Sequence, residues 1–156
     1  MWKWILMAAH PLTVKHLLGR HVAGQPPLSP IDWIRVIRDG LPVGVIDEVT
    51  KATRLTQSEL MKSLGIAERT IMRRKKESAG KQDIRLNSEE TAKLLRFARV
   101  AERASQAFED DEAALDWLRT ANHALESQRP LDLLDTDLGA ELVMDTLGRI
   151  EHGIFA

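Results

Sequence analysis

At 156 residues, with 44% hydrophobic and 29% charged side chains, the chain can form one substantial core or two small ones, and its composition argues against a disordered chain and against an integral membrane protein. Cysteine is absent, which excludes disulfides, thiolate metal sites and cysteine nucleophiles, and favours a reducing compartment, the cytoplasm. The net charge of −1 is unevenly distributed: Lys51 to Lys81 holds nine Lys and Arg against three Asp and Glu, a net +6, whereas Glu109 to Ala156 holds three against twelve, a net −9.

Residues 1–28 are assigned to an N-terminal extension of unknown role. The uncharged apolar run from Trp4 to Ala9 has six residues, fewer than the roughly 7 to 15 of a signal-peptide core, so we expect neither a signal nor a membrane span. His10, His16 and His21 do not share one helix face, and no metal or cofactor is expected.

Apolar residues recur at helical spacing along nearly the whole chain while alternating β-type runs are missing, so the sequence predicts an all-α fold. Ser29 can cap a helix that has Pro30 in its first turn and Asp32 three residues after the cap. The buried stripe of this helix is expected to be Ile31, Ile34 and Ile37. A second helix is predicted from about Val43 to Thr53.

The next segment has the pattern of a helix-turn-helix. Thr56 and Glu59 form a second capping-box sequence at the start of a short helix, Gly65 ends that helix, and a basic helix follows from Ile66 to Lys76. Many such units have a small residue four positions before the turn glycine, where this chain has Met61, a difference that changes the angle or the packing of the pair. The residues expected to hold the two helices together are Leu60, Leu64, Ile66 and Ile71.

Three more helices are predicted in the remaining chain. A long one runs from Asn87 or Ser88 to about Phe108, and a short one runs from Asp110 to Ala121. A turn at Arg129-Pro130 precedes the last helix, which begins near Asp135-Thr136-Asp137. Its inward side is expected to be Leu142, Val143, Leu147 and Ile150.

The second helix of the helix-turn-helix is the candidate DNA-binding element. Arg69, Arg73 and Lys76 form one stripe, with Arg69 and Arg73 suited to guanine edges and the other basic residues to phosphates. If five basic residues each neutralise a phosphate, the log-log salt slope of binding is about −4 to −5. The alternative is a solvated basic helix face without a nucleic-acid ligand. The predicted DNA-binding residues are Arg69, Thr70, Arg73, Arg74, Lys75 and Lys76.

Several C-terminal segments carry a family resemblance, chief among them Ala114-Leu115-Asp116-Trp117-Leu118, Arg129-Pro130-Leu131-Asp132-Leu133-Leu134-Asp135-Thr136 and Leu147-Gly148-Arg149-Ile150-Glu151-His152-Gly153. They resemble the toxin-binding domain of Xre/MbcA/ParS antitoxins over residues 110–156, and Thr70 to Arg74 resembles the helix-turn-helix region of the same family. The resemblance implies an Xre-like helix-turn-helix bundle over residues 29–108, followed by a small helical toxin-binding domain over residues 109–156.

The sequence has neither a P-loop nor the Rossmann glycine pattern, and no nucleophile followed by a convincing base, so no catalytic activity is expected. The resemblance implies a binding function. The partner would be a RES-type toxin, an NAD-consuming enzyme, and the end of the antitoxin would cover its active-site cleft. A homodimer that binds operator DNA and represses its own promoter is implied as well. The toxin-contacting residues would be Arg149, Ile150, His152, Gly153, Ile154 and Phe155.

Two other functions remain open. One is a stand-alone helix-turn-helix regulator whose acidic C-terminal domain senses a ligand or only dimerises, and which has no tightly bound protein partner. The other is a pure protein-interaction antitoxin, which binds its toxin tightly but whose degenerate helix-turn-helix does not bind operator DNA.

Overall fold

The computed structural model describes residues 12–22, 27–79 and 84–154, and the chain is all helical over these residues, as the sequence predicts. They contain no β-strand, and the pairs Pro42–Arg85 and Asn122–Gln128 form isolated bridges. No helix in this part of the chain is long and apolar enough to cross a membrane. The elements are α2 (Val14–Leu17), η1 (Gly19–His21), α3 (Pro30–Asp39), α4 (Val45–Thr53), α5 (Gln57–Leu64), α6 (Glu68–Ser78), α7 (Ser88–Phe108), α8 (Asp111–Arg119), η2 (His123–Leu125), η3 (Pro130–Leu133) and α9 (Asp137–Glu151).

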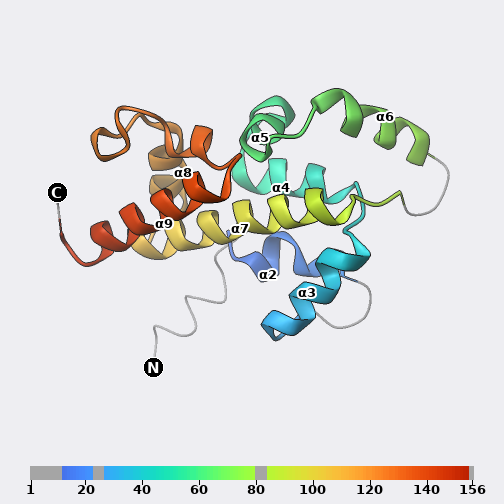
Figure 1. The fold of residues 1–156 in the computed structure, drawn as a ribbon, viewed down its shortest axis with the longest axis horizontal. Coiled ribbons are helices and arrows are strands. Elements are labelled where there is room, and N and C mark those ends of the chain that lie inside the picture. Colours follow the sequence, from blue (N-terminus) through green and yellow to red (C-terminus); the bar gives the residue numbers. More distant parts are fainter. Residues whose placement is uncertain (1–11, 23–26, 80–83, 155–156) are drawn as a thin grey trace.

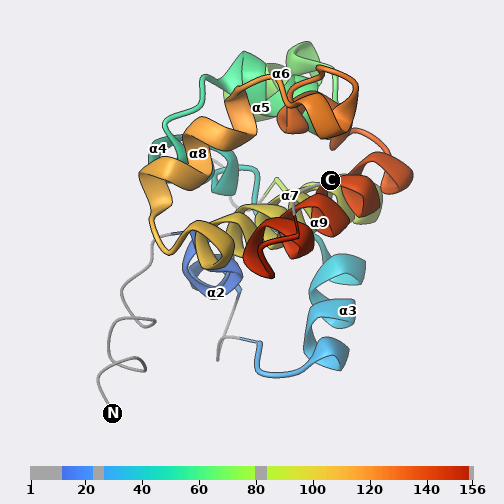
Figure 2. The ribbon, with the colours of Figure 1, turned by 90° about the vertical axis from the view of Figure 1, so that its left-hand side faces the viewer.

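The long helix α7 forms the axis of the molecule, with α2, α3, α5, α8 and α9 packed against it (Figure 1; Figure 2). It begins where Asn87 accepts a hydrogen bond from the backbone N–H of Glu90 (2.8 Å) and the Glu90 carboxylate accepts one from the N–H of Asn87 (2.9 Å). These reciprocal bonds satisfy two donors that a helix start otherwise leaves unpaired. The buried side of α7 includes Leu94, Phe97, Ala98, Ala101 and Ala104.

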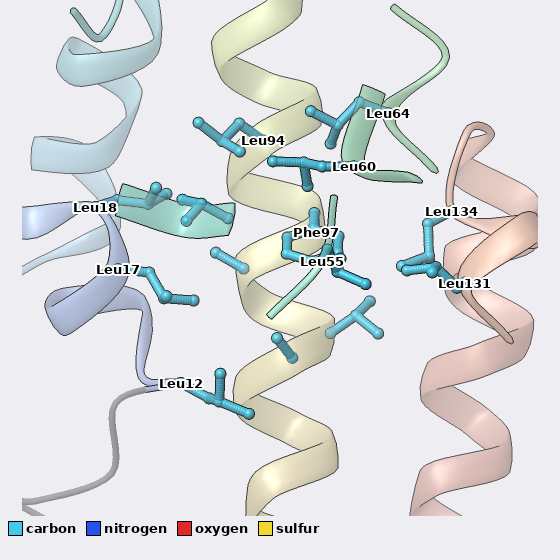
Figure 3. Packing of buried hydrophobic residues seen from close by; sticks show 14 of the residues in the cluster. Leu12, Leu17, Leu18, Leu55, Leu60, Leu64, Leu94, Phe97, Leu131 and Leu134 are labelled. Carbon is cyan, nitrogen blue, oxygen red and sulfur yellow. The ribbon is translucent and has the colours of Figure 1, made fainter. Parts of the chain in front are cut away.

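One continuous hydrophobic core joins the N-terminal and C-terminal helices through α7. Phe97 of α7 is 1% exposed and lies at the centre of this core. Figure 3 shows it next to Leu55, which precedes α5, with Leu131 and Leu134 at η3 to the right of both. The helix-turn-helix and the C-terminal helices are therefore two parts of one packed unit.

The predicted buried stripe of α3 is wrong. Ile31 and Ile34 are 57% and 41% exposed, and Ile37 is half-buried. The helix instead faces α7 with Val36, which is buried, and with Trp33, which packs against the core while half-buried. The helix begins as expected, because Ser29 and Asp32 form both bonds of a capping box. The capping-box pattern therefore predicted the start of the helix correctly, but which face of the helix is buried depends on where α7 lies.

Both ends of α9 are fastened to α7. At the start, Thr136 caps the helix by accepting from the N–H of Gly139 (3.0 Å), and Asp137 pairs with Arg96 of α7. At the other end, Glu151 pairs with Arg103 of α7. The inward residues include Ala140, Val143, Thr146 and Leu147. The sequence also predicted Leu142 to face inward, which is wrong, since Leu142 is 47% exposed.

Candidate functional site

The helix-turn-helix forms at the predicted residues. Thr56 accepts from the N–H of Glu59 (3.1 Å), and Glu59 accepts from the N–H of Thr56 (2.8 Å), which caps α5. Gly65 then turns the chain with φ +63°, a left-handed conformation that glycine adopts at little cost. The second helix, α6, begins at Glu68, two residues later than predicted, because Ile66 and Ala67 complete the turn.

The angle between α5 and α6 is maintained by buried side chains. Leu60, Leu64 and Ile71 are fully buried, as predicted. Met61 is 1% exposed, so the larger residue four positions before the turn glycine is accommodated inside the core. The carbonyl of Met61 also accepts from the N–H of Ile66 (3.0 Å), which closes the turn. Met61 therefore belongs to the framework of the motif.

The capping box of α5 provides a prediction about pH. Hydrogen bonds from the backbone N–H of Thr56, and then from its hydroxyl, lower the pKa of Glu59 below its ordinary value. A lowered folded-state pKa means that the carboxylate stabilises the fold above its unfolded pKa of about 4.3, and that this contribution is lost as the pH falls through the folded-state pKa. Glu59→Gln should lower the free energy of unfolding by up to about 1 kcal/mol at neutral pH. Urea titrations should show that the difference in unfolding free energy between the variant and the unaltered chain vanishes in strongly acidic buffer. An equal difference at neutral and acidic pH would contradict a contribution from the charged carboxylate.

The basic residues of α6 fall into two groups. Arg69, Arg73 and Lys76 are exposed on the outer side of the helix. Arg73 also lies 3.9 Å from Glu77, but its side chain remains 70% exposed. Predicted residue Thr70 is half-buried beside this side. We call Arg69, Arg73 and Lys76 the basic face.

The other two basic residues connect α6 to its neighbours. Arg74 forms an ion pair with Glu90, the residue that caps α7, and the two side chains are only 21% and 10% exposed. Lys75 pairs with Asp47 of α4 and donates to the side-chain oxygen of Gln57. Both cations are therefore engaged within the fold, and they hold α6 against α4, α5 and α7.

Sequence reasoning missed an exposed apolar residue beside the basic face. Met72 is 54% exposed and lies three residues after Arg69, so it shares the outer side of α6. The amide of Gln57 contacts its sulfur at 3.0 Å. The sequence did contain a signal for its position, because Met72 lies three residues after Arg69 and four before Lys76 and so falls on the same side of the helix.

The predicted toxin-contacting residues lie at the C-terminal end of α9, at the opposite end of the molecule from α6 (Figure 1). Gly153, with φ +66°, ends the helix, and the N–H of Ile154 donates to the carbonyl of Arg149 (2.9 Å). Ile154 is 61% exposed and does not fold back onto the core. Arg149 and His152 are also exposed, whereas Ile150 is half-buried. Phe155 lies outside the described residues.

Two family models match the chain. The model described as "Antitoxin Xre-like helix-turn-helix domain" matches residues 32–99, and the model described as "Antitoxin Xre/MbcA/ParS C-terminal toxin-binding domain" matches residues 103–153. A protein named "Antitoxin Xre" from Yersinia enterocolitica is 32% identical over 147 residues, which cover 94% of this chain and 95% of that protein. The chain belongs to the Xre antitoxin family. Its matched ranges meet inside α7, so that helix contributes to both Xre domains.

Other relatives extend the comparison. A second "Antitoxin Xre", from Photorhabdus laumondii subsp. laumondii, is 32% identical over 132 residues, or 84% of this chain and 86% of that protein. A "Prs ADP-ribosylating antitoxin" from a Sphingobium species is 28% identical over 137 residues, or 82% of this chain and 83% of that protein. The similarity to Xre antitoxins therefore covers both the helix-turn-helix and the C-terminal helices.

Proposed function

We propose that the chain is the antitoxin of a type II toxin–antitoxin system, and that it neutralises a RES-type, NAD-consuming toxin by covering the toxin's active-site cleft with residues 149–156. The observation that carries this proposal is the exposed C-terminal end of α9, with Ile154 61% exposed, inside the region that matches a toxin-binding domain. An exposed apolar side chain beside polar ones is the usual composition of a protein contact.

Charge supports the same partner. NAD carries a pyrophosphate, so a pocket that binds it should be electropositive, and residues 109–156 carry a net charge of −9. The name of the Sphingobium relative includes ADP-ribosylation, a reaction that consumes NAD. The acidic domain would thus be steered toward the cleft of an enzyme that uses NAD.

We also propose that α6 binds operator DNA as part of a homodimer, and that the protein represses its own operon in the cytoplasm. Arg69 and Arg73 would contact base edges, Lys76 would contact phosphate, and Thr70 would contact the backbone beside them. Arg74 and Lys75, which the sequence assigned to DNA, are proposed to position α6 instead, because both are engaged in internal ion pairs. A two-fold dimer would contact two half-sites about one helical turn apart.

Operator affinity is expected to fall with salt less steeply than it would if all five basic residues of α6 contacted phosphates. Three exposed cations on α6 give a log-log slope of at most about −3 per subunit, compared with about −4 to −5 for five. Arg69→Ala and Arg73→Ala should each weaken binding by about 1–3 kcal/mol and relax base preference, whereas Lys76→Ala should weaken all sequences equally. Fluorescence anisotropy over a salt series, with DNA from upstream of the gene, measures both effects.

Arg99→Ala is the matched control for this series, because Arg99 is an exposed arginine on α7 and not on α5 or α6. Its operator affinity should equal that of the unaltered chain, and footprinting should show two half-sites. Salt-independent binding, or an equal loss in the control, would contradict the assignment of the basic face. Absence of any RES-type partner together with intact operator binding would favour the stand-alone regulator, and the reverse result would favour an antitoxin that does not bind DNA.

A further inference from the structure

The outer side of α9 exposes leucines that the fold does not use. Leu138 is 76% exposed and Leu142, one turn later on the same side, is 47% exposed. The opposite side of the helix is buried, with Val143 and Leu147 fully buried. Two large apolar side chains on a helix whose core contacts are already complete indicate a surface that another molecule covers.

Acidic side chains lie along one flank of this pair of leucines. Asp137, Glu141 and Asp145 are all exposed on α9. Within the described part of the chain, Glu141 and Asp145 form no ion pair, and the side chain of Asp137 remains 90% exposed although it contacts Arg96. An apolar centre with a charged rim is the arrangement found in protein interfaces, and the sign of this rim selects a basic partner surface.

The position of the leucine pair relative to the C-terminal end is fixed by the fold. The two ion pairs to α7, at Asp137 and Glu151, hold α9 at its first and last turns. The carbonyl of Leu134 accepts a further bond from Arg96 (3.1 Å). In addition, a Cβ on Gly139 would lie 1.9 Å from the carbonyl oxygen of Leu133, so the helix start packs directly against η3. Residues held in this way need little further ordering when they bind.

We propose that Leu138 and Leu142, here called the α9 leucine pair, form a second contact surface for the toxin, which docks a basic-rimmed apolar patch on them next to its active-site cleft. This inference rests on the proposed function and adds a division of roles to it. The leucine pair provides affinity, whereas residues 149–156 obstruct the cleft. The helical rise places Leu138 about 20 Å along the axis from Glu151, the last residue of α9, so one elongated strip of α9 contacts the toxin.

Two observations favour the toxin over a second copy of the chain. The leucine pair lies on the same helix as Arg149 to Ile154 and within the range that matches the toxin-binding domain. A two-fold contact between two copies would also bring Asp137, Glu141 and Asp145 of each copy toward the same acidic residues of the other, and like charges at close range oppose association.

The exposed face of α3 supplies a matched control. Ile31 and Ile34 are exposed to a similar degree, 57% and 41%, but they lie outside the matched toxin-binding range. Introducing glutamates at Ile31 and Ile34 therefore changes surface charge and exposed apolar area in the same way as introducing them at Leu138 and Leu142, without touching α9.

The test compares Leu138→Glu/Leu142→Glu, Ile31→Glu/Ile34→Glu, the chain ending at Gly148 and the unaltered protein. The probe is the purified RES-type toxin that the full-length chain retains in affinity purification from its host. We expect the α9 double variant to bind at least about 30-fold more weakly, through faster dissociation, and still to stop NAD consumption completely at saturating concentration. The α3 variant should bind like the unaltered protein. The shortened chain should keep measurable toxin binding through the leucine pair but need at least about 100-fold more protein for half-inhibition of NAD consumption. If the melting temperature or the operator binding of the glutamate variant differs from that of the unaltered chain, Leu138→Ala/Leu142→Ala replaces it. We expect this alanine variant to lose about fivefold to tenfold in toxin affinity.

The outcomes separate the inference from the proposed function. Unchanged toxin affinity in the α9 variants, with inhibition lost in the shortened chain, would overturn the leucine-pair contact and leave toxin neutralisation in place. An equal loss of toxin affinity in the α3 control would also overturn it. So would an α9 variant that changes from dimer to monomer while its toxin affinity is preserved. If the unaltered chain binds no RES-type toxin, both the inference and the proposed function fail.

Discussion

Removal of residues 149–156 is expected to raise the concentration of antitoxin needed for half-inhibition of the toxin by at least about 100-fold, because the exposed groups proposed to cover the cleft are lost together. The change deletes Arg149, His152 and Ile154, which the structure leaves exposed, and keeps the buried side of α9 through Leu147. The measurement is NAD consumption by the purified toxin, titrated with the full-length and the shortened protein.

The truncation also removes the Arg103–Glu151 ion pair, and a control must account for this. Glu151→Gln weakens that pair in an otherwise full-length chain. The hydrogen bond from Arg103 lowers the pKa of Glu151, so the glutamate is charged at neutral pH and the substitution removes a real attraction. Glu151→Gln should nevertheless inhibit the toxin like the unaltered chain. If the shortened protein inhibits as well as the full-length one, the C-terminal end does not cover the cleft.

The features that could be predicted from sequence are those determined by neighbouring residues. Ser29 and Thr56 cap their helices because a capping box needs only a partner three residues later, and Gly65 turns the chain because a left-handed φ is accessible to glycine. The long helix also follows directly from the spacing of its apolar residues. These features depend on distances of a few residues, which the sequence shows directly.

What could not be predicted depends on residues far apart in the chain. Ile31 and Leu142 fit a buried stripe by spacing, yet α3 and α9 meet α7 through other sides, and the position of α7 is a property of the whole packing. Arg74 resembles the other arginines of α6 until Glu90, 16 residues away, is placed beside it. Charge and periodicity indicate which residues can contact DNA or a toxin, but only the packing shows which of them are already engaged.

The same dependence on packing predicts that Phe97→Ala destabilises the entire chain. Deleting a fully buried aromatic ring costs about 3–5 kcal/mol, because transfer energy is lost and a cavity remains. Phe97 contributes to the one core that joins the helix-turn-helix to the C-terminal helices, so both parts should lose stability together. Phe108→Ala, on the same helix, is the control, since Phe108 is half-buried beside Trp117 with ring centroids 5.8 Å apart, and it should cost less.

Urea unfolding followed by tryptophan fluorescence measures the two parts separately. One variant keeps only Trp33 in α3, the other keeps only Trp117 in α8, and both lack Trp2 and Trp4. Coincident transitions that both shift to lower urea in Phe97→Ala are expected, because two-state unfolding requires different probes to agree. Separate transitions, with only one shifted, would show that the parts flanking α7 unfold independently. In that case α7 would connect two folding units, and damage to the DNA-binding part would leave toxin neutralisation intact.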